Sequence, residues 1–453
     1  MKPQQVQPVM VHKRYRIEIH DLTHDGEGVG RHEGFTVFVP DAIPGDVVLA
    51  RVTSVKKSYA RAVVEEILVK SPQRMIPICP TAEWCGGCQL AQMAYKQQLV
   101  WKERYVREAL ARLGKVQAQV LPIIGMELPE GYRNKAEFAV GMVDGQSVVG
   151  FYQKGSHRIV DIDYCRIQYS LTNKALQSVK RALVELGGAP SSGLRHVVIK
   201  VSFSNHTVMV IFVTRGRELP YTEQLLSRLR EDVPELVSVY QNVNPHNTVV
   251  VFGDESRLLW GKPYIVEQIG ALKYAISPRS FFQVNPIQAK MLYDLVKEAA
   301  ALTGRETIWD LYCGTGSIGL YLADGAHAVV GVESVADAVI DARLNAKLNG
   351  ITNARFITGK AEEVAPQLVR EGLQPDVVIV DPPRKGCEAG LLETINAVAV
   401  PRLVYVSCNP ATLARDLGVL ADYGYQVEYV QPVDMFPDTA HVECVTLMSK
   451  VEK

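Results

Sequence analysis

The sequence lacks any apolar run long enough to cross a bilayer, and its first residues lack the apolar core of a secretion signal. We therefore expect a cytoplasmic protein with no membrane partner. Disulfides are rare in that compartment, so the eight cysteines are expected to act as free thiols, metal ligands or catalytic groups rather than as cross-links.

The sequence also lacks a net charge, since 49 Lys and Arg residues balance 49 Asp and Glu residues. The total therefore gives no indication of a nucleic-acid partner. The distribution is uneven, because residues 1–115 contain 17 Lys and Arg residues against 12 Asp and Glu residues. A basic N-terminal part favours a polyanionic partner, with an ordinary solvated surface as the alternative.

Short strands separated by Gly- and Asp-rich turns are predicted near the N-terminus. The predicted strands are residues 15–19, 36–39, 46–55 and 61–68. This spacing is typical of a small barrel, so residues 1–70 are predicted to form an OB-like β-barrel. Basic residues around Tyr59 suit contact with a nucleic-acid backbone or, equally, a solvated face. They are Arg51, Lys56, Lys57 and Arg61.

Three cysteines lie close together, at Cys79, Cys85 and Cys88. Two glycines separate the last pair, and glycine lets the backbone fold tightly enough for both thiolates to face one metal centre. The next cysteine in the chain, Cys165, is the candidate fourth ligand. Four cysteines can hold zinc or an iron–sulfur cluster, and the spacing alone leaves both open. The remaining alternative is a set of unrelated free thiols.

An amphipathic helix is predicted at residues 91–113, with its basic residues, Lys102 among them, on the polar faces. Its apolar stripe consists of Leu99, Val106, Leu110 and Leu113. Residues 71–270 as a whole alternate strands and helices and are predicted to form a mixed α+β central domain. Hairpin turns are expected at residues 144–145 and 205–206.

A β-α-β pattern begins in the C-terminal part. Residues 307–311 and 328–333 are predicted strands, and the glycine-rich turn at residues 310–319 would let the backbone approach a ligand closely. Glu333 ends the second strand, where a carboxylate can bind the two hydroxyls of a ribose. NAD and S-adenosylmethionine both suit this pattern. Asp310 favours S-adenosylmethionine, because an acid in the loop would repel a pyrophosphate.

Chemically useful side chains lie at the ends of three further strands of this predicted sheet. Asp381 precedes two prolines, which fix the turn at a strand end. Cys408 follows an apolar strand, at the edge where open α/β sheets place their chemistry. Glu443 directly precedes the closing strand, residues 444–450. A lone cysteine after a strand is more often a buried structural residue, but these neighbours favour a catalytic one.

A thiolate and a base are what methylation of a pyrimidine C5 requires. C5 is too weak a nucleophile to take a methyl group unaided, whereas addition of a thiolate to C6 makes C5 enolate-like. A base then removes the C5 proton and the thiolate leaves. Cys408 is the predicted nucleophile, provided that its setting lowers the pKa of the thiol. Glu443 is the predicted base, with His441 as the second candidate, and Asp381 would bind the uracil imide edge or orient the base. The target base would have to flip out of its helix.

Together these motifs resemble those of the RNA uracil-5-methyltransferases. The matching stretches are residues 277–286, 310–319, 381–386, 407–410 and 441–444. The N-terminal barrel resembles the TRAM domain of RNA-modifying enzymes, and the barrel with the cysteine quartet resembles the branch that acts on 23S ribosomal RNA. The resemblance implies a Rossmann-like methyltransferase domain at residues 271–453.

The resemblance also implies roles for individual residues. It implies S-adenosylmethionine binding by Gln283, Tyr312, Glu333 and Asp381. It implies Cys408 as the nucleophile and Glu443 as the base. It implies a [4Fe–4S] cluster held by Cys79, Cys85, Cys88 and Cys165. The helix at residues 91–114 would pack on the methyltransferase domain.

The predicted function is therefore C5-methylation of a uridine in 23S ribosomal RNA by a monomeric enzyme. A transfer-RNA methyltransferase is the alternative within the same class, and such an enzyme is expected to lack the barrel and the cysteine quartet. The alternatives from other classes are a catalytically inactive iron–sulfur RNA-binding protein and an NAD-dependent oxidoreductase. The intact Cys408 and Glu443 argue against the first, and Asp310 argues against the second.

Overall fold

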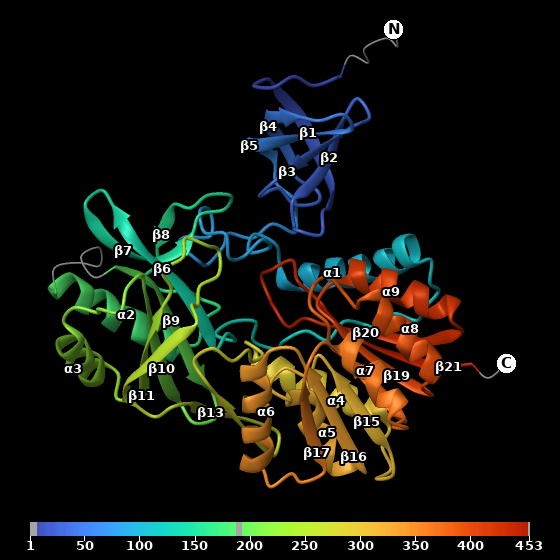
Figure 1. The fold of residues 1–453 in the computed structure, drawn as a ribbon. Coiled ribbons are helices and arrows are strands. Elements are labelled where there is room, and N and C mark those ends of the chain that lie inside the picture. The colour runs from blue at the N-terminus through green and yellow to red at the C-terminus, as the bar shows by residue number, and fades with distance from the viewer. Residues whose placement is uncertain (1–6, 187–192, 452–453) are drawn as a thin grey trace.

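A computed structural model describes residues 7–186 and 193–451 of the chain. These residues form a closed barrel, two seven-stranded sheets and a two-stranded sheet. Figure 1 shows the barrel at the top, the first large sheet at the left and the second at the lower right. Within the described residues, no helix is long and apolar enough to cross a membrane.

The N-terminal barrel has five strands in the order β1-β2-β3-β5-β4. They are β1 Arg14–Leu22, β2 Gly28–His32, β3 Phe35–Val39, β4 Val47–Val55 and β5 Tyr59–Val69. The predicted small barrel is confirmed, but β2 had been taken for a turn because it is rich in glycine. Those glycines serve close packing, since a Cβ on Gly30 would lie 2.2 Å from Cγ2 of Ile17.

The central sheet has the order β12-β11-β10-β9-β6-β7-β8. Its strands are β6 Lys135–Val143, β7 Gln146–Tyr152, β8 Ile159–Asp161, β9 Leu194–Ser202, β10 Thr207–Thr214, β11 Leu236–Val243 and β12 Glu255–Gly261. Two helices, α2 Ser170–Glu185 and α3 Thr222–Asp232, pack against it and bury a shared apolar core. Both predicted hairpins are present, and Asp144 and His206 adopt the positive φ angles that tight hairpin turns use. The hairpin β13 Ile265–Ile269 and β14 Leu272–Ile276 follows.

The C-terminal sheet has the order β17-β16-β15-β18-β19-β21-β20. Its strands are β15 Thr307–Leu311, β16 Ala328–Glu333, β17 Ala354–Thr358, β18 Val377–Val380, β19 Arg402–Ser407, β20 Tyr425–Val433 and β21 Glu443–Lys450. The first five strands in this order are parallel, and β21 and β20 close the sheet in antiparallel fashion. The accompanying helices are α4 Pro286–Ala300, α5 Ser317–Leu322, η3 Ala323–Gly325, α6 Ala336–Leu348, α7 Ala361–Arg370, α8 Ala389–Val398 and α9 Pro410–Asp422. The predicted Rossmann-like α/β sheet is confirmed.

The helix between the barrel and the central sheet consists of α1 Tyr95–Ala109 and a π-helical turn, η1 Leu110–Gly114. In Figure 1 α1 lies beside α9, far from the central sheet to which it is adjacent in sequence. Gly114 allows this approach, since a Cβ there would lie 2.4 Å from the carbonyl oxygen of Ala414. The predicted stripe is partly wrong, because Leu113 is 60% exposed while Lys102 is fully buried.

Candidate active site

The glycine-rich turn between β15 and α5 forms one wall of the site. Tyr312, Gly314 and Gly316 all have positive φ angles, which glycine adopts freely and tyrosine rarely. A Cβ on Gly314 would meet nothing within 4 Å, so the backbone borders open space there. Such a turn exposes its peptide groups to a ligand.

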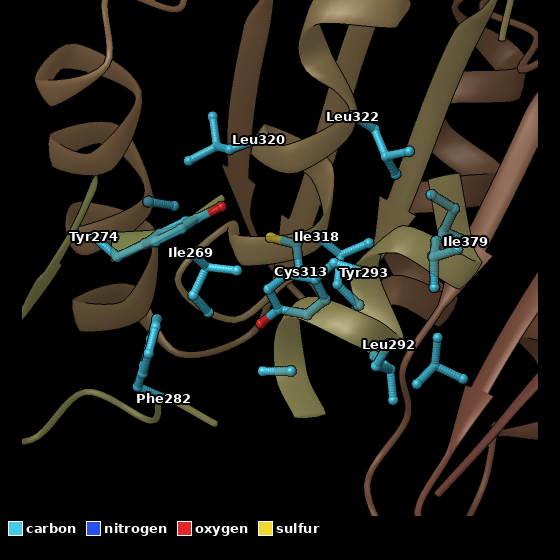
Figure 2. Close-up of a cluster of buried hydrophobic side chains, with 14 of the residues drawn as sticks. Ile269, Tyr274, Phe282, Leu292, Tyr293, Cys313, Ile318, Leu320, Leu322 and Ile379 are labelled. Carbon is cyan, nitrogen blue, oxygen red and sulfur yellow. The ribbon is translucent and has the colours of Figure 1, made fainter. Parts of the chain in front are cut away.

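Apolar residues anchor this turn from below. Figure 2 shows Cys313 and Ile318, which flank the turn, within one buried cluster that also contains Tyr274 of β14 and Tyr293 of α4. Each is at most 6% exposed. The turn is therefore fixed by the core beneath it while its glycines remain free to face a ligand.

Three carboxyl groups stand at the ends of adjacent parallel strands. Glu333 ends β16 and accepts hydrogen bonds from the backbone N–H groups of Gly314, at 3.1 Å, and Val335, at 2.8 Å. Asp310 is buried in β15 and accepts one from the N–H of Gly319 at 2.8 Å. Asp381 directly follows β18. The pKa of both Asp310 and Asp381 is raised to about 7, mainly by burial and to a smaller extent by a neighbouring carboxyl group.

Strand register brings Cys408 and Glu443 together. β19 and β21 are antiparallel, and Ser407 pairs with Cys444. The next residue beyond Ser407 is Cys408, and the residue before Cys444 is Glu443, so both leave this pair at the same end of the two strands. Asn409 then caps α9, its side chain accepting a hydrogen bond from the N–H of Ala411.

The setting of Cys408 raises the pKa of its thiol to about 12, mainly through burial and then through Glu443 and Asp381. The assignment of Cys408 as the nucleophile was made on the condition that its setting lowers this pKa, and the protein without a bound cofactor does not meet that condition. The main reason is that the sulfur is buried, which disfavours the charged thiolate, and the carboxyl groups at the sheet edge add a smaller effect of the same sign. Burial and Asp381 also raise the pKa of Glu443 well above its usual range.

Arg384 supplies the opposing positive charge. Its guanidinium lowers the pKa of both Cys408 and Glu443, against the larger effect of burial. Its position is fixed because its carbonyl oxygen accepts hydrogen bonds from Asn409 Nδ2 and Thr412 Oγ1. No role in the site was predicted for Arg384 from the sequence. The only local sign of such a role is that this arginine directly follows Asp381-Pro382-Pro383 at a strand end.

A cavity of about 460 Å³ lies between the C-terminal part and the central domain, and Asp381, Cys408 and Glu443 are not among its lining residues. Gln283, Arg384 and His441 line it from the C-terminal part, and Arg133 and Lys135 line it from the start of β6. Gln283 is held in place where its carbonyl oxygen accepts a hydrogen bond from Asn134 Nδ2 at 3.1 Å. The cavity is therefore lined by three cationic side chains together with polar and apolar residues and the acid Glu137.

All four cysteines of the predicted quartet line the same cavity. They are Cys79, Cys85, Cys88 and Cys165. Each is a free thiol, and burial, with a smaller effect of the other thiols, raises the pKa of Cys165 to about 11. Among the residues that the structure describes, no three His, Cys, Asp or Glu side chains are close enough to hold one metal ion. The donor set, four neighbouring free thiols, is nevertheless the chemistry that zinc and iron–sulfur clusters use.

Tyr312 is placed differently from the other predicted cofactor residues. It directly follows β15, but the groups that raise the pKa of its hydroxyl after burial are Cys387 and Glu362 rather than Asp310 or Asp381. Within the described chain, the buried hydroxyl has no hydrogen-bond partner. Any contact of Tyr312 with a ligand near Glu333 would therefore use its ring or its backbone.

Known protein families and relatives match this chain along nearly its whole length. The family described as tRNA (Uracil-5-)-methyltransferase matches residues 94–451, and the TRAM domain matches residues 8–64. A protein of Halalkalibacterium halodurans, named an uncharacterized RNA methyltransferase, is 48% identical over 97% of this chain and 98% of its own length. A protein of Caldanaerobacter subterraneus with the same description is 45% identical over 98% of this chain and 99% of its own length.

A solved structure extends the similarity to three dimensions. The tRNA (uracil-54, C5)-methyltransferase of Pyrococcus abyssi, solved with S-adenosyl-L-homocysteine, has a TM-score of 0.76 and 30% sequence identity. The match covers 96% of this chain and all of that one. A match of this extent includes the N-terminal barrel. The expectation that a transfer-RNA enzyme lacks the barrel is therefore wrong. The presence of a barrel therefore does not identify the RNA.

Proposed function

We propose that this chain, which belongs to the tRNA (uracil-5-)-methyltransferase family, methylates C5 of a uridine in 23S ribosomal RNA. Family membership makes it an S-adenosylmethionine-dependent RNA methyltransferase. The observation that best supports C5 chemistry is the register of β19 and β21, which sets a thiol and a carboxyl group at one sheet edge. A nucleophile and a base are the two groups that this reaction needs from the protein.

Cys408 is proposed as the nucleophile and Glu443 as the base. The Cys408 sulfur would bond to C6 of the uracil, which shifts electron density to C5. After C5 has gained its methyl group, Glu443 would take the C5 proton, and the electron pair of that C–H bond would expel the thiolate. When bound, S-adenosylmethionine supplies the electrophilic methyl group and a positive charge that favours the ionised forms of both residues.

Arg384 would assist these two residues. Its guanidinium already opposes the rise in the pKa of Cys408 and of Glu443. A cation beside a thiol is a common means of raising its thiolate fraction, and the exposed Arg384 side chain supplies one here. Asp381, on the neighbouring strand end, would bind the uracil imide edge or orient the base.

The cofactor is proposed to lie across the ends of β15, β16 and β18, with four side chains in contact with it. They are Gln283, Tyr312, Glu333 and Asp381. The hydrogen bond from the Gly314 N–H to Glu333 supports this arrangement, because it places the carboxylate beside the glycine-rich turn, where it could bind ribose hydroxyls. For Tyr312 the proposal is limited to the ring or backbone.

Cys79, Cys85, Cys88 and Cys165 are proposed to hold a [4Fe–4S] cluster. Their shared cavity and their free thiols support a common ligand. Such a cluster would bind the thiolates and cross-link the segment that contains Cys79–Cys88 to the end of β8. Its role would be structural, because Cys408 and Glu443 already supply the groups for methyl transfer.

We further propose three domains, at residues 1–70, 71–270 and 271–453, in a cytoplasmic monomer. The separate barrel and the two large sheets support this division. The packing of α1 on α9 supports the expectation that the helix at residues 91–114 belongs spatially with the methyltransferase domain. The eight free cysteines agree with a reducing compartment.

Transfer RNA is the second candidate substrate, because the Pyrococcus abyssi structure is that of a transfer-RNA enzyme. The deciding experiment maps 5-methyluridine in ribosomal and transfer RNA from cells with and without this gene. We expect loss of the modification from 23S ribosomal RNA alone. Loss from transfer RNA alone would identify transfer RNA as the substrate instead. No loss from either RNA would overturn the proposed function.

A further inference from the structure

The connection between β20 and β21, residues 434–442, is buried although it has no regular secondary structure. It ends at Glu443 and includes His441, so its path sets where both side chains lie. Buried backbone polar groups outside helices and sheets need other partners. The partners of this connection come from distant segments, and they include Tyr132, whose hydroxyl donates a hydrogen bond to the carbonyl oxygen of Pro437 at 2.8 Å.

Gln98 of α1 makes the most extensive contact with this connection. Its Nε2 donates to Asp438 Oδ1 at 2.9 Å, and its Oε1 accepts from the Asp438 backbone N–H at 2.9 Å. The same amide nitrogen lies 2.9 Å from the carbonyl oxygen of Met93. Gln98 is only 1% exposed, so solvent is a poor replacement for these partners.

Asp438 holds an uncommon backbone conformation at this point, with a φ of 64°. Aspartate tolerates that region better than most residues, yet it still needs surrounding contacts to keep it there. The reciprocal pair with Gln98 provides such contacts on both the side chain and the backbone. Loss of the pair would let the connection relax toward a different path and so move Glu443.

Both cysteine-bearing segments also reach Asp438. The N–H of Leu90, two residues after Cys88, donates to the Asp438 carbonyl oxygen at 2.8 Å. Arg166, next to Cys165, donates to Asp438 Oδ2 at 3.3 Å. The buried Asp438 thus contacts α1, the segment that contains Cys88 and the segment that contains Cys165.

We infer that Gln98 and Asp438 are positioning residues for proton removal by Glu443, and that they tie the path of residues 434–442 to the two cysteine-bearing segments. This inference rests on the proposed function for the role of Glu443. It does not depend on which metal centre the cysteines hold. It assigns to two residues outside the cavity a specific effect on the last step of the reaction.

The first test replaces Gln98 by methionine, which keeps the length of the side chain and removes its hydrogen bonds. With S-adenosylmethionine and uridine-containing RNA, we expect the Q98M variant to accumulate a covalent protein–RNA adduct, because the base is misplaced while the nucleophile is not. Small displacements of a catalytic group can cost about 100-fold in rate, so we expect kcat to fall about 10- to 100-fold. The KM for S-adenosylmethionine should stay within about twofold, because an effect confined to the base leaves cofactor binding unchanged.

Two variants separate positioning from general destabilisation. Gln241 is a buried glutamine of β11 that donates to Thr214 Oγ1 and to the Gly216 carbonyl, remote from the connection. Q241M should lower stability without adduct accumulation. Asp438→Asn keeps an oxygen that can accept from Gln98, so it should retain most of the wild-type release rate. Equal adduct behaviour in Q98M and Q241M would overturn the inference.

Amide hydrogen exchange gives a readout that is independent of catalysis. In Q98M, exchange should accelerate at residues 434–443 and at residues 88–93, and Q241M should leave both segments unchanged. Unchanged exchange at residues 434–443 in Q98M would overturn the inference even if the wild-type enzyme is active. If the wild-type chain methylates no RNA, the proposed function fails, and the exchange result still decides whether Gln98 holds this connection.

Discussion

The guanidinium of Arg384 lies 3.2 Å from Nε2 of His441. Burial, followed by Arg384, lowers the pKa of His441 to about 4, so the imidazole is neutral near pH 7 and its Nε2 can accept a hydrogen bond from the guanidinium. A nitrogen that accepts from a cation is a poor acceptor for a second proton. This contact therefore favours Glu443 over His441 as the base.

Replacement of Cys408 by alanine should abolish methylation, because no other group can form the covalent bond to C6. RNA binding should change little, since a thiol contributes a small part of the contact with a polyanion. Transfer of labelled methyl groups and RNA binding at fixed salt concentration are the two measurements. Cys387→Ala, at a buried thiol of the same domain, is the control and should retain turnover. Persistent methylation by Cys408→Ala would place the nucleophile elsewhere.

Replacement of Glu443 by glutamine should trap the protein on its RNA. The amide is isosteric but cannot take the C5 proton, so the adduct forms and does not resolve. Denaturing electrophoresis with labelled RNA measures the trapped fraction. Glu428→Gln, at an exposed position on β20, should release product normally. Normal turnover by the Glu443→Gln enzyme would show that Glu443 is not the base.

Folding stability should depend on pH through Asp381. Its pKa is about 7 in the folded chain against 3.8 for an ordinary aspartate, so the folded state binds this proton more tightly than the unfolded state. The contribution is fully present below about pH 4 and is lost as pH rises through 7, with a limiting slope of about 1.4 kcal/mol per pH unit.

Asp381→Asn should therefore flatten the fall in stability between pH 4 and 7 and leave the variant more stable than the wild type at pH 8. Urea unfolding of the protein at several pH values, without added cofactor, provides the measurement. The exposed Asp422→Asn is the control. Parallel pH profiles for the wild type and Asp381→Asn would show that this carboxyl group is not protonated in the folded state.

Removal of one partner of the buried ion pair between Lys102 and Asp434 should lower the free energy of unfolding. The two side chains are fully buried, and Nζ lies 2.6 Å from Oδ1. Lys102→Met leaves the buried carboxylate without its cation, which typically costs about 3–5 kcal/mol. Removal of both charges in Lys102→Met with Asp434→Leu should restore much of that stability. Denaturant unfolding checks both variants, and a single variant as stable as the wild type would contradict the prediction.

The cysteine quartet should make the protein brown when it is purified without oxygen. Iron and sulfide analysis should give about four of each per chain, as a [4Fe–4S] cluster requires. Cys88→Ser should lose the colour, while Cys444→Ser, at a buried thiol outside the cavity, should keep it. A colourless protein with one zinc ion per chain would replace the cluster with a structural zinc site.

Local sequence signals predicted the C-terminal sheet well. β15 and β16 have the predicted boundaries, because each is an apolar run that ends in a clear turn or acid. Strand order and register then follow the ordinary rules for α/β sheets, and these rules placed Cys408, Asp381 and Glu443 at one edge.

The errors arose where distant segments decide the outcome. β2 was missed because its glycines are required by close contacts within the barrel, of Gly30 with Ile17 on the paired strand β1 and of Gly28 with Ala42, rather than by turn geometry. Lys102 was assigned to a polar face, although it is completely buried against Asp434 in the connection between β20 and β21. The direction of the pKa shift of Cys408 could not be read from the sequence either, since burial of the sulfur and the carboxyl groups of Glu443 and Asp381 depend on the packing of separate strands. Tertiary contacts of this kind leave no local pattern.

The hydrogen bond between Lys102 and Asp434 spans 332 positions of the chain. During translation α1 therefore emerges long before the residues that bury it, and a nascent chain cannot seat this helix until its last strands have been made. Long-range closure of this kind slows folding. Premature termination near the end of the message would consequently release a product with a complete barrel and central sheet but with the face of α1 that normally packs on the C-terminal domain exposed. Chaperones and proteases recognise such exposed surfaces.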